Sequence, residues 1–182
     1  MYSLARLGVV AYDVDEVLNL EHLGHIPNLA KLHLQGKLRG GVAPSILHSF
    51  TKVRDLHMGW SGLQMDPLPS FSHMLNLTRL RLYRAYDGQI LTFKAGWFPK
   101  LKELRLADME QLRFIEVEAG TMQNLNLLLI RGLRDMLVVP SGFRYLTTVQ
   151  KMLVWDMPQG FVERAQGDDF VLLKHINDIR YR

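Results

Sequence analysis

The sequence contains no cysteine, and this absence excludes several kinds of protein at once. Without cysteine there is no disulfide framework, no thiol catalysis and no zinc site with cysteine ligands. No apolar run approaches the roughly 18 residues that a membrane-spanning helix requires. The N-terminus also lacks the basic segment and long apolar stretch of a secretory signal. We therefore expect a soluble protein of a reducing compartment, the cytoplasm.

Composition leaves the kind of partner open. The 182 residues are 48% hydrophobic and 22% charged, as in globular proteins, and they carry a formal charge of +4. With an isoelectric point near 9.4, the possible partners include nucleic acids, anionic membranes and acidic protein surfaces.

Leucine is abundant, and it is arranged in a repeating pattern. The six-residue motif LxxLxL, in which Val, Met or Ile can replace Leu, occurs seven times. The first spacing is 25 residues and every later one is 24. The motif begins at Leu4, Leu29, Val53, Leu77, Leu101, Leu125 and Val149.

This motif and period are typical of leucine-rich repeats. The last four residues of each motif alternate in the manner of a half-buried strand, and successive strands stack in parallel about 4.8 Å apart. The sequence therefore predicts an α/β solenoid of about seven repeats. A curved parallel sheet forms its concave face, and short helical turns and loops form its convex face.

The two ends of the array are expected to differ. We assign residues 1–155 to the solenoid and 156–182, in which we find no eighth motif, to a C-terminal capping tail. The N-terminus has no comparable cap, so either more chain precedes it or another surface covers it. The motif also lacks the asparagine or cysteine that often follows it and ties loops together, which predicts irregular turns.

Segments between the motifs carry a more specific resemblance. In order along the chain these are DPLP (66–69), RAYDG (84–88), FPKLKEL (98–104), EAGTM (118–122), VPSG (139–142) and DMP (156–158). None has a general purpose in a leucine-rich repeat. Together they resemble the C-terminal repeats of plant coiled-coil nucleotide-binding leucine-rich-repeat (NLR) disease-resistance proteins.

The resemblance implies a role in innate immunity. In that family the repeats recognise a pathogen effector or a guarded host protein, and they hold the receptor's nucleotide-binding domain inactive until perception triggers the hypersensitive response. The phosphate loop GxxxxGK[ST] and the coiled-coil region are absent from these 182 residues. The resemblance therefore implies no cofactor in this chain, with ATP or ADP bound only by the nucleotide-binding domain of a full-length receptor.

The outward positions of the seven motifs form three columns across the concave face. They contain seven basic and two acidic side chains, a net +5. The first column contains Arg6, Lys31, Asp55, Arg79, Glu103, Leu127 and Lys151. The second contains Gly8, His33, His57, Arg81, Arg105, Leu129 and Leu153. The third contains Val10, Gln35, Gly59, Tyr83, Ala107, Arg131 and Trp155.

The charged residues, histidines and aromatic residues of these columns are the candidate protein-binding site. Arginine and tyrosine are the residue types that anchor protein interfaces, and we hypothesise that Arg79, Arg81 and Arg105 meet an acidic protein surface. Merely solvated side chains are an equally weighted alternative. Nucleic acid is less favoured, because no ladder of aromatic residues interleaves the basic ones.

The last two repeats change character on this face. Leu127, Leu129 and Leu153, with Trp155, occupy outward positions and predict an exposed apolar patch. The alternative is that the tail covers them.

Catalytic and metal sites are not predicted. His33 and His57 share a column with Asp55 nearby, but a structural zinc site needs four ligands and no further set is evident. No nucleophile with a base and an orienting group can be assembled, which predicts a protein that is not an enzyme. The functional alternative to an immune receptor is a stand-alone leucine-rich-repeat scaffold or a ubiquitin-ligase substrate adaptor.

Overall fold

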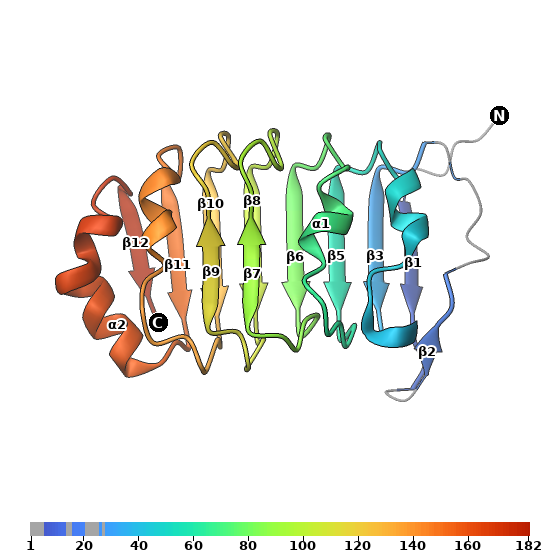
Figure 1. The fold of residues 1–182 in the computed structure, drawn as a ribbon, viewed down its shortest axis with the longest axis horizontal. Helices are drawn as coiled ribbons and strands as arrows, with labels where there is room; N and C mark the ends of the chain where they lie inside the picture. The colour runs from blue at the N-terminus through green and yellow to red at the C-terminus, as the bar shows by residue number, and fades with distance from the viewer. Residues whose placement is uncertain (1–5, 14–15, 21–25, 27) are drawn as a thin grey trace.

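The computed structural model describes residues 6–13, 16–20, 26 and 28–182. The start of the first motif at Leu4 and the N-terminal end of the array lie outside the described residues. Within them the chain forms a leucine-rich-repeat solenoid, an α/β fold built on a single parallel sheet of eight strands (Figure 1).

Each motif forms one strand of this sheet, and neighbouring strands pair in parallel without a shift in register. The seven strands predicted from the repeat are β1 (Arg6–Val10), β3 (Lys31–Gln35), β5 (Asp55–Gly59), β6 (Arg79–Tyr83), β8 (Glu103–Ala107), β10 (Leu127–Arg131) and β11 (Lys151–Trp155).

The convex side contains short and varied elements. The parallel pairs β2 with β4 and β7 with β9 form two small sheets, and single turns of helix fill the other connections (Figure 1). These elements are β2 (Val17–Leu18), β4 (Lys37–Leu38), η2 (Arg39–Gly41), η3 (Ser45–Ser49), α1 (Leu68–Phe71), β7 (Ile90–Phe93), β9 (Phe114–Val117) and η4 (Ser141–Tyr145).

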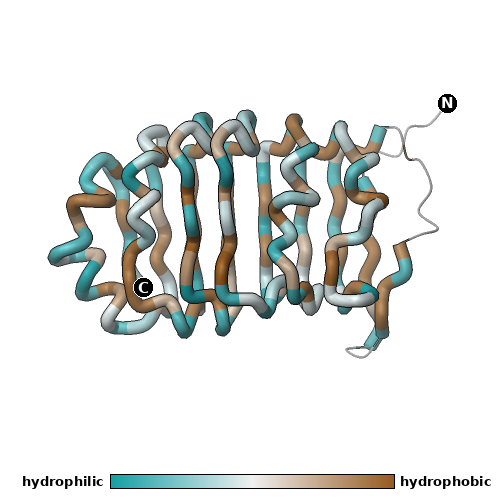
Figure 2. Tube along the Cα trace, viewed as in Figure 1, coloured by the Kyte–Doolittle hydropathy of each residue, from teal (hydrophilic) through white to brown (hydrophobic). Residues whose placement is uncertain are grey.

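The core lies between the sheet and the convex elements. Along strands such as β3 (KLHLQ) and β6 (RLRLY) hydrophobic and hydrophilic residues alternate (Figure 2), because every second side chain points inward. The inward residues at the same motif position stack from repeat to repeat, and from β3 to β11 each is at most 2% exposed, whereas those of β1 and β12 are half-buried. One such column contains Leu32, Leu56, Leu80, Leu104, Leu128 and Met152.

The tail contains a strand that the sequence reading missed. After α2 (Gln159–Gln166) and η5 (Asp168–Leu172), the chain forms β12 (Asp178–Tyr181), which pairs in parallel with β11. The expectation of no eighth motif is therefore wrong. Ile176, Ile179 and Tyr181 follow the LxxLxL spacing, but this motif begins 27 residues after Val149 rather than 24.

The turns that follow the strands are more regular than expected. From β1 to β10 the residue after each strand of the eight-stranded sheet donates its backbone N–H to the last residue of the next strand, as Trp60 does to Tyr83 and Arg84 does to Ala107. From the third repeat on, the position expected to hold asparagine is buried, with Ala85 and Leu133 both 0% exposed, but in the first two repeats Tyr12 and Lys37 are exposed. From the fourth repeat on, backbone hydrogen bonds and an apolar column tie the loops, and the prediction of irregular turns is wrong for these repeats.

Glycine is required where η4 crosses β9. A Cβ atom on Gly142 would clash with the backbone oxygen of Val117 and lie 2.8 Å from the Val117 Cβ. Gly160, in α2, has no heavy atom within 4 Å of the same position.

We predict that Gly142→Ala lowers the free energy of unfolding by about 1–3 kcal/mol, the usual cost of overpacking. The matched change Gly160→Ala should stabilise α2 slightly, by at most about 1 kcal/mol, because alanine is the better helix former. Urea unfolding followed by circular dichroism measures both. Equal effects of the two substitutions would contradict the close approach of η4 and β9.

Candidate protein-binding face

The structure places the predicted site residues in three columns, each running across the strands of the concave face. The pairing of neighbouring strands gives every predicted neighbour in the predicted order, from Arg6 opposite Lys31 to Arg131 opposite Trp155. The registration of the columns is therefore confirmed. Strand β12 extends them, with Asp178 opposite Lys151 and Arg180 opposite Leu153.

Arg79, Arg81 and Arg105, which we call the arginine cluster, form ion pairs with carboxylates of the same concave face. Asp55 accepts hydrogen bonds from Arg81 Nη2 at 2.9 and 3.0 Å and from Arg79 Nη1 at 3.3 Å. Glu103 accepts one from Arg105 Nε at 2.6 Å and lies 3.9 Å from Arg79 Nε. Since in-register strands bring column neighbours close together, these residues form a mixed-charge network rather than a uniformly basic patch.

A second cluster gathers around the ring of Tyr83 at the end of β6. Trp60 packs edge-on against this ring with centroids 4.5 Å apart, and the guanidinium carbons of Arg131 and Arg84 lie 5.6 and 5.8 Å from the Tyr83 centroid. Arg131 also donates to Asp108 at 2.7 Å. We call Trp60, Tyr83, Arg84, Asp108 and Arg131 the aromatic cluster.

Arg131 controls the ionisation of Asp108 in this cluster. Burial alone would raise the pKa of Asp108, but the hydrogen bond and charge of Arg131, with help from Tyr83 and Arg84, outweigh burial and lower it. The carboxylate is therefore held ionised, and it fixes the Arg131 guanidinium beside the Tyr83 ring.

Three members of the aromatic cluster were missed by the sequence reading. Trp60, Arg84 and Asp108 each come directly after a strand and adopt positive φ angles of 50°, 48° and 55°. This left-handed conformation is unusual for residues other than glycine, and it is sustained because each backbone N–H bonds to the next strand. The signal in the sequence is the 24-residue spacing of these positions, two of which, 36 and 132, are glycine.

The predicted exposed apolar patch needs correction. Leu129 and Leu153 are only 4% and 9% exposed, and Leu127 is half-buried. With β12 in place, Leu153 is an interior position of the sheet, flanked by Leu129 on one side and Arg180 on the other. Trp155 is also half-buried, and the Arg182 guanidinium carbon lies 5.7 Å from the centroid of its ring.

His33 and His57 stack on each other in the second column. Their ring centroids are 4.2 Å apart and the planes are 9° from parallel. Burial, the adjacent His33 ring and the Arg81 guanidinium lower the pKa of His57, outweighing the opposite influence of Asp55. In the part of the chain that the structure describes, no group of three His, Asp or Glu side chains is arranged to hold a metal ion.

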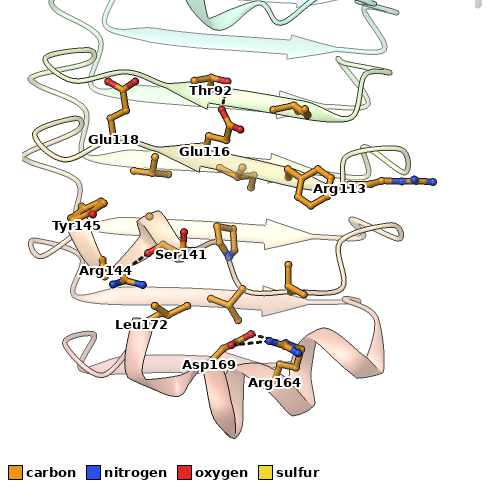
Figure 3. A pocket seen from close by; sticks show the side chains of 18 of the residues that line it. Thr92, Arg113, Glu116, Glu118, Ser141, Arg144, Tyr145, Arg164, Asp169 and Leu172 are labelled. Atoms are coloured by element: carbon orange, nitrogen blue, oxygen red, sulfur yellow. Dashed lines mark hydrogen bonds and ion pairs between the residues drawn. The ribbon is translucent and has the colours of Figure 1, made fainter.

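The convex side, opposite the candidate site, contains a groove between β9 and η4. It encloses about 960 Å³, and Ile115 and Val139 are among the residues that line it. At its far end the Arg164 guanidinium is paired with Asp169, with Arg164 Nε 2.7 Å from Asp169 Oδ2 (Figure 3). No residue of the candidate site lies in this groove.

The comparison with curated proteins gives one consistent result. The chain is 26% identical to Disease resistance RPP8-like protein 3 of Arabidopsis thaliana over an alignment of 177 residues. This alignment covers 95% of the chain. The chain is 25% identical over 171 residues to Disease resistance protein RPP8 and 23% identical over 183 residues to Disease resistance protein RPH8A, both from A. thaliana, covering 92% and 99% of the chain. Its homologues are plant disease-resistance proteins.

The disease-resistance homologues are much longer than this chain. It spans 18% of the length of RPP8-like protein 3 and 19% of RPH8A. No protein-family model matches the sequence. Among the residues that the structure describes, no helix is long and apolar enough to cross a membrane.

We predict that His57 makes folding sensitive to acid. Because its pKa is lowered in the folded state from the ordinary 6.5, the unfolded chain takes up a proton more readily as the pH falls below 6.5. Stability is thus retained above that pH and lost progressively as the pH falls through the folded-state pKa.

His57→Gln should therefore lose less unfolding free energy than the unmodified protein between about pH 7.5 and about pH 5.5, as measured by urea denaturation. His73→Gln is the control, since His73 packs against His48, 4.9 Å away, and lies outside the second column. If His57→Gln and the unmodified protein lose the same stability, the burial argument for His57 is wrong.

Proposed function

We propose that this chain is the recognition and autoregulatory module of a plant intracellular immune receptor that acts in the cytoplasm. Its concave face binds a pathogen effector or a guarded host protein, and it also contacts the receptor's own nucleotide-binding domain. Support comes from the disease-resistance homologues, which are similar to nearly the whole chain.

The aromatic cluster supports this proposal most directly, and we propose that its residues contact the partner. Tyrosine, tryptophan and arginine contribute most of the binding energy of many protein interfaces. Here they are held ready before any partner arrives, because Asp108 fixes Arg131 and the Tyr83 ring lies against Trp60. Trp60 is 41% exposed, so a partner can bury it.

The mechanism is a two-state equilibrium of the receptor. Contacts between the concave face and the nucleotide-binding domain favour the inactive state, and a ligand that binds the same face only in the active state shifts the population. The repeats need no catalytic group for this, so we propose that the chain is not an enzyme. ATP or ADP would bind in the nucleotide-binding domain alone.

The direct test is a triple substitution in the full-length receptor. Tyr83→Ala, Arg131→Ala and Trp155→Ala together should weaken partner binding by at least about tenfold, because Tyr83 and Arg131 belong to the aromatic cluster and Trp155 lies opposite Arg131 in the third column. Expression in leaves should then show either loss of the pathogen-triggered cell death or cell death without pathogen. Loss reports the recognition contact, and spontaneous death reports the inhibitory contact.

The control removes three exposed side chains on other parts of the surface. Leu137, Tyr145 and Val171 are 58%, 47% and 60% exposed, and none lies in the three columns. Their combined replacement by alanine should leave both responses unchanged. Unaltered responses in the concave variant, or equal changes in both variants, would remove the proposal.

A further inference from the structure

The N-terminal end of the concave face contains a small hollow. It encloses about 240 Å³ between β1, β3, β5 and β6, within the candidate protein-binding face. We call it the β1–β6 hollow.

Gly8 leaves the space that makes this hollow. It occupies the second column of β1, opposite His33, and a Cβ atom built on it has no heavy atom within 4 Å. Every other described strand has a large side chain in this column. Those side chains are His33, His57, Arg81, Arg105, Leu129, Leu153 and Arg180.

The walls of the β1–β6 hollow carry an excess of positive charge. Arg6, Lys31 and Arg81 line it, against the single carboxylate of Asp55. The two oxygens of Asp55 already accept hydrogen bonds from Arg81 and Arg79. Arg6 and Lys31 have no ion-pair partner within residues 6–13, 16–20, 26 and 28–182.

Two nitrogen atoms of the lining side chains lack a hydrogen-bond partner. Among the described residues, Nε2 of His33 and Nε of Arg81 are the two buried side-chain polar atoms in this condition. Buried polar groups nearly always find a partner, and the Nε–H of arginine can only donate. An acceptor group would therefore be stabilising at Nε of Arg81, and also at Nε2 of His33 in the tautomer that carries the proton there.

We propose that the β1–β6 hollow binds one oxyanion group, a carboxylate or a phosphate. Lys31 and Arg6 supply the accessible charge, and the guanidinium of Arg81 forms the inner wall beneath it. A carboxylate would come from an aspartate or glutamate side chain of a bound protein, and in this respect the inference rests on the proposed function. A phosphate would come from solution.

The test uses the 182-residue chain with selectively ¹⁵N-labelled histidine. Inorganic phosphate and acetate are the probes, added separately at constant ionic strength, and the ring signals of His33 and His57 report occupancy. We expect a saturable change. Lys31→Glu should weaken the binding at least about tenfold, as expected for the loss of a charged hydrogen bond.

Lys151→Glu is the matched control, because Lys151 is the same residue type in the same column of β11. It should change the affinity by no more than about twofold, since exposed charges this far apart are screened. Gly8→Leu is the second variant, which fills the hollow without altering charge. It should abolish binding while the thermal unfolding temperature is kept.

Each outcome either supports or overturns the proposed oxyanion site. Saturation by acetate that is lost in Lys31→Glu and Gly8→Leu identifies a carboxylate site, and saturation by phosphate alone identifies a phosphate site. Absence of saturation by either probe, or equal weakening by Lys31→Glu and Lys151→Glu, overturns the inference. If the probes fail while the Tyr83, Arg131 and Trp155 substitutions still alter receptor responses, the hollow is excluded and the proposed function stands.

Discussion

The structure depends on the in-register stacking of parallel strands, one from each repeat. Inward residues of neighbouring strands meet like with like, so that Leu32, Leu56 and Leu80 form one continuous buried column. A shift of one residue in β5, β6 or β8 would expose this column and bury charged side chains instead. The same constraint fixes the concave face, because the outward residues can only meet their counterparts one repeat away.

The fixed registration explains the chemistry of the concave face. It sets Asp55 beside Arg79 and Arg81, and Glu103 beside Arg79 and Arg105, so that carboxylates divide the arginine cluster. It also leaves Gly8 opposite His33, which opens the β1–β6 hollow next to Arg6 and Lys31, two cations without an ion-pair partner among the described residues. The face therefore offers two different surfaces to a partner, a basic hollow at one end and the aromatic cluster nearer the middle.

Much of this could be predicted from the sequence, because a 24-residue period specifies both the strands and their neighbours. This period predicts the parallel sheet and the three columns, and it places His33 next to His57, where the two rings stack. Strand β12 could not be found in this way, since the longer tail places Ile176 three residues out of phase. The aromatic cluster was missed for another reason. It depends on left-handed residues such as Trp60, and the only sequence signal for their conformation is the glycine found at two equivalent positions, 36 and 132.

The central claim is that one set of registered columns runs across all eight strands, including β12. Disulfide trapping tests it without background, because the chain has no cysteine. The substitutions Lys151→Cys and Asp178→Cys place two thiols on register partners in β11 and β12, where the strand spacing of about 4.8 Å allows a disulfide. The account predicts rapid cross-linking of this pair and little cross-linking of Lys151→Cys with Arg180→Cys, whereas equal yields or the reverse preference would contradict it.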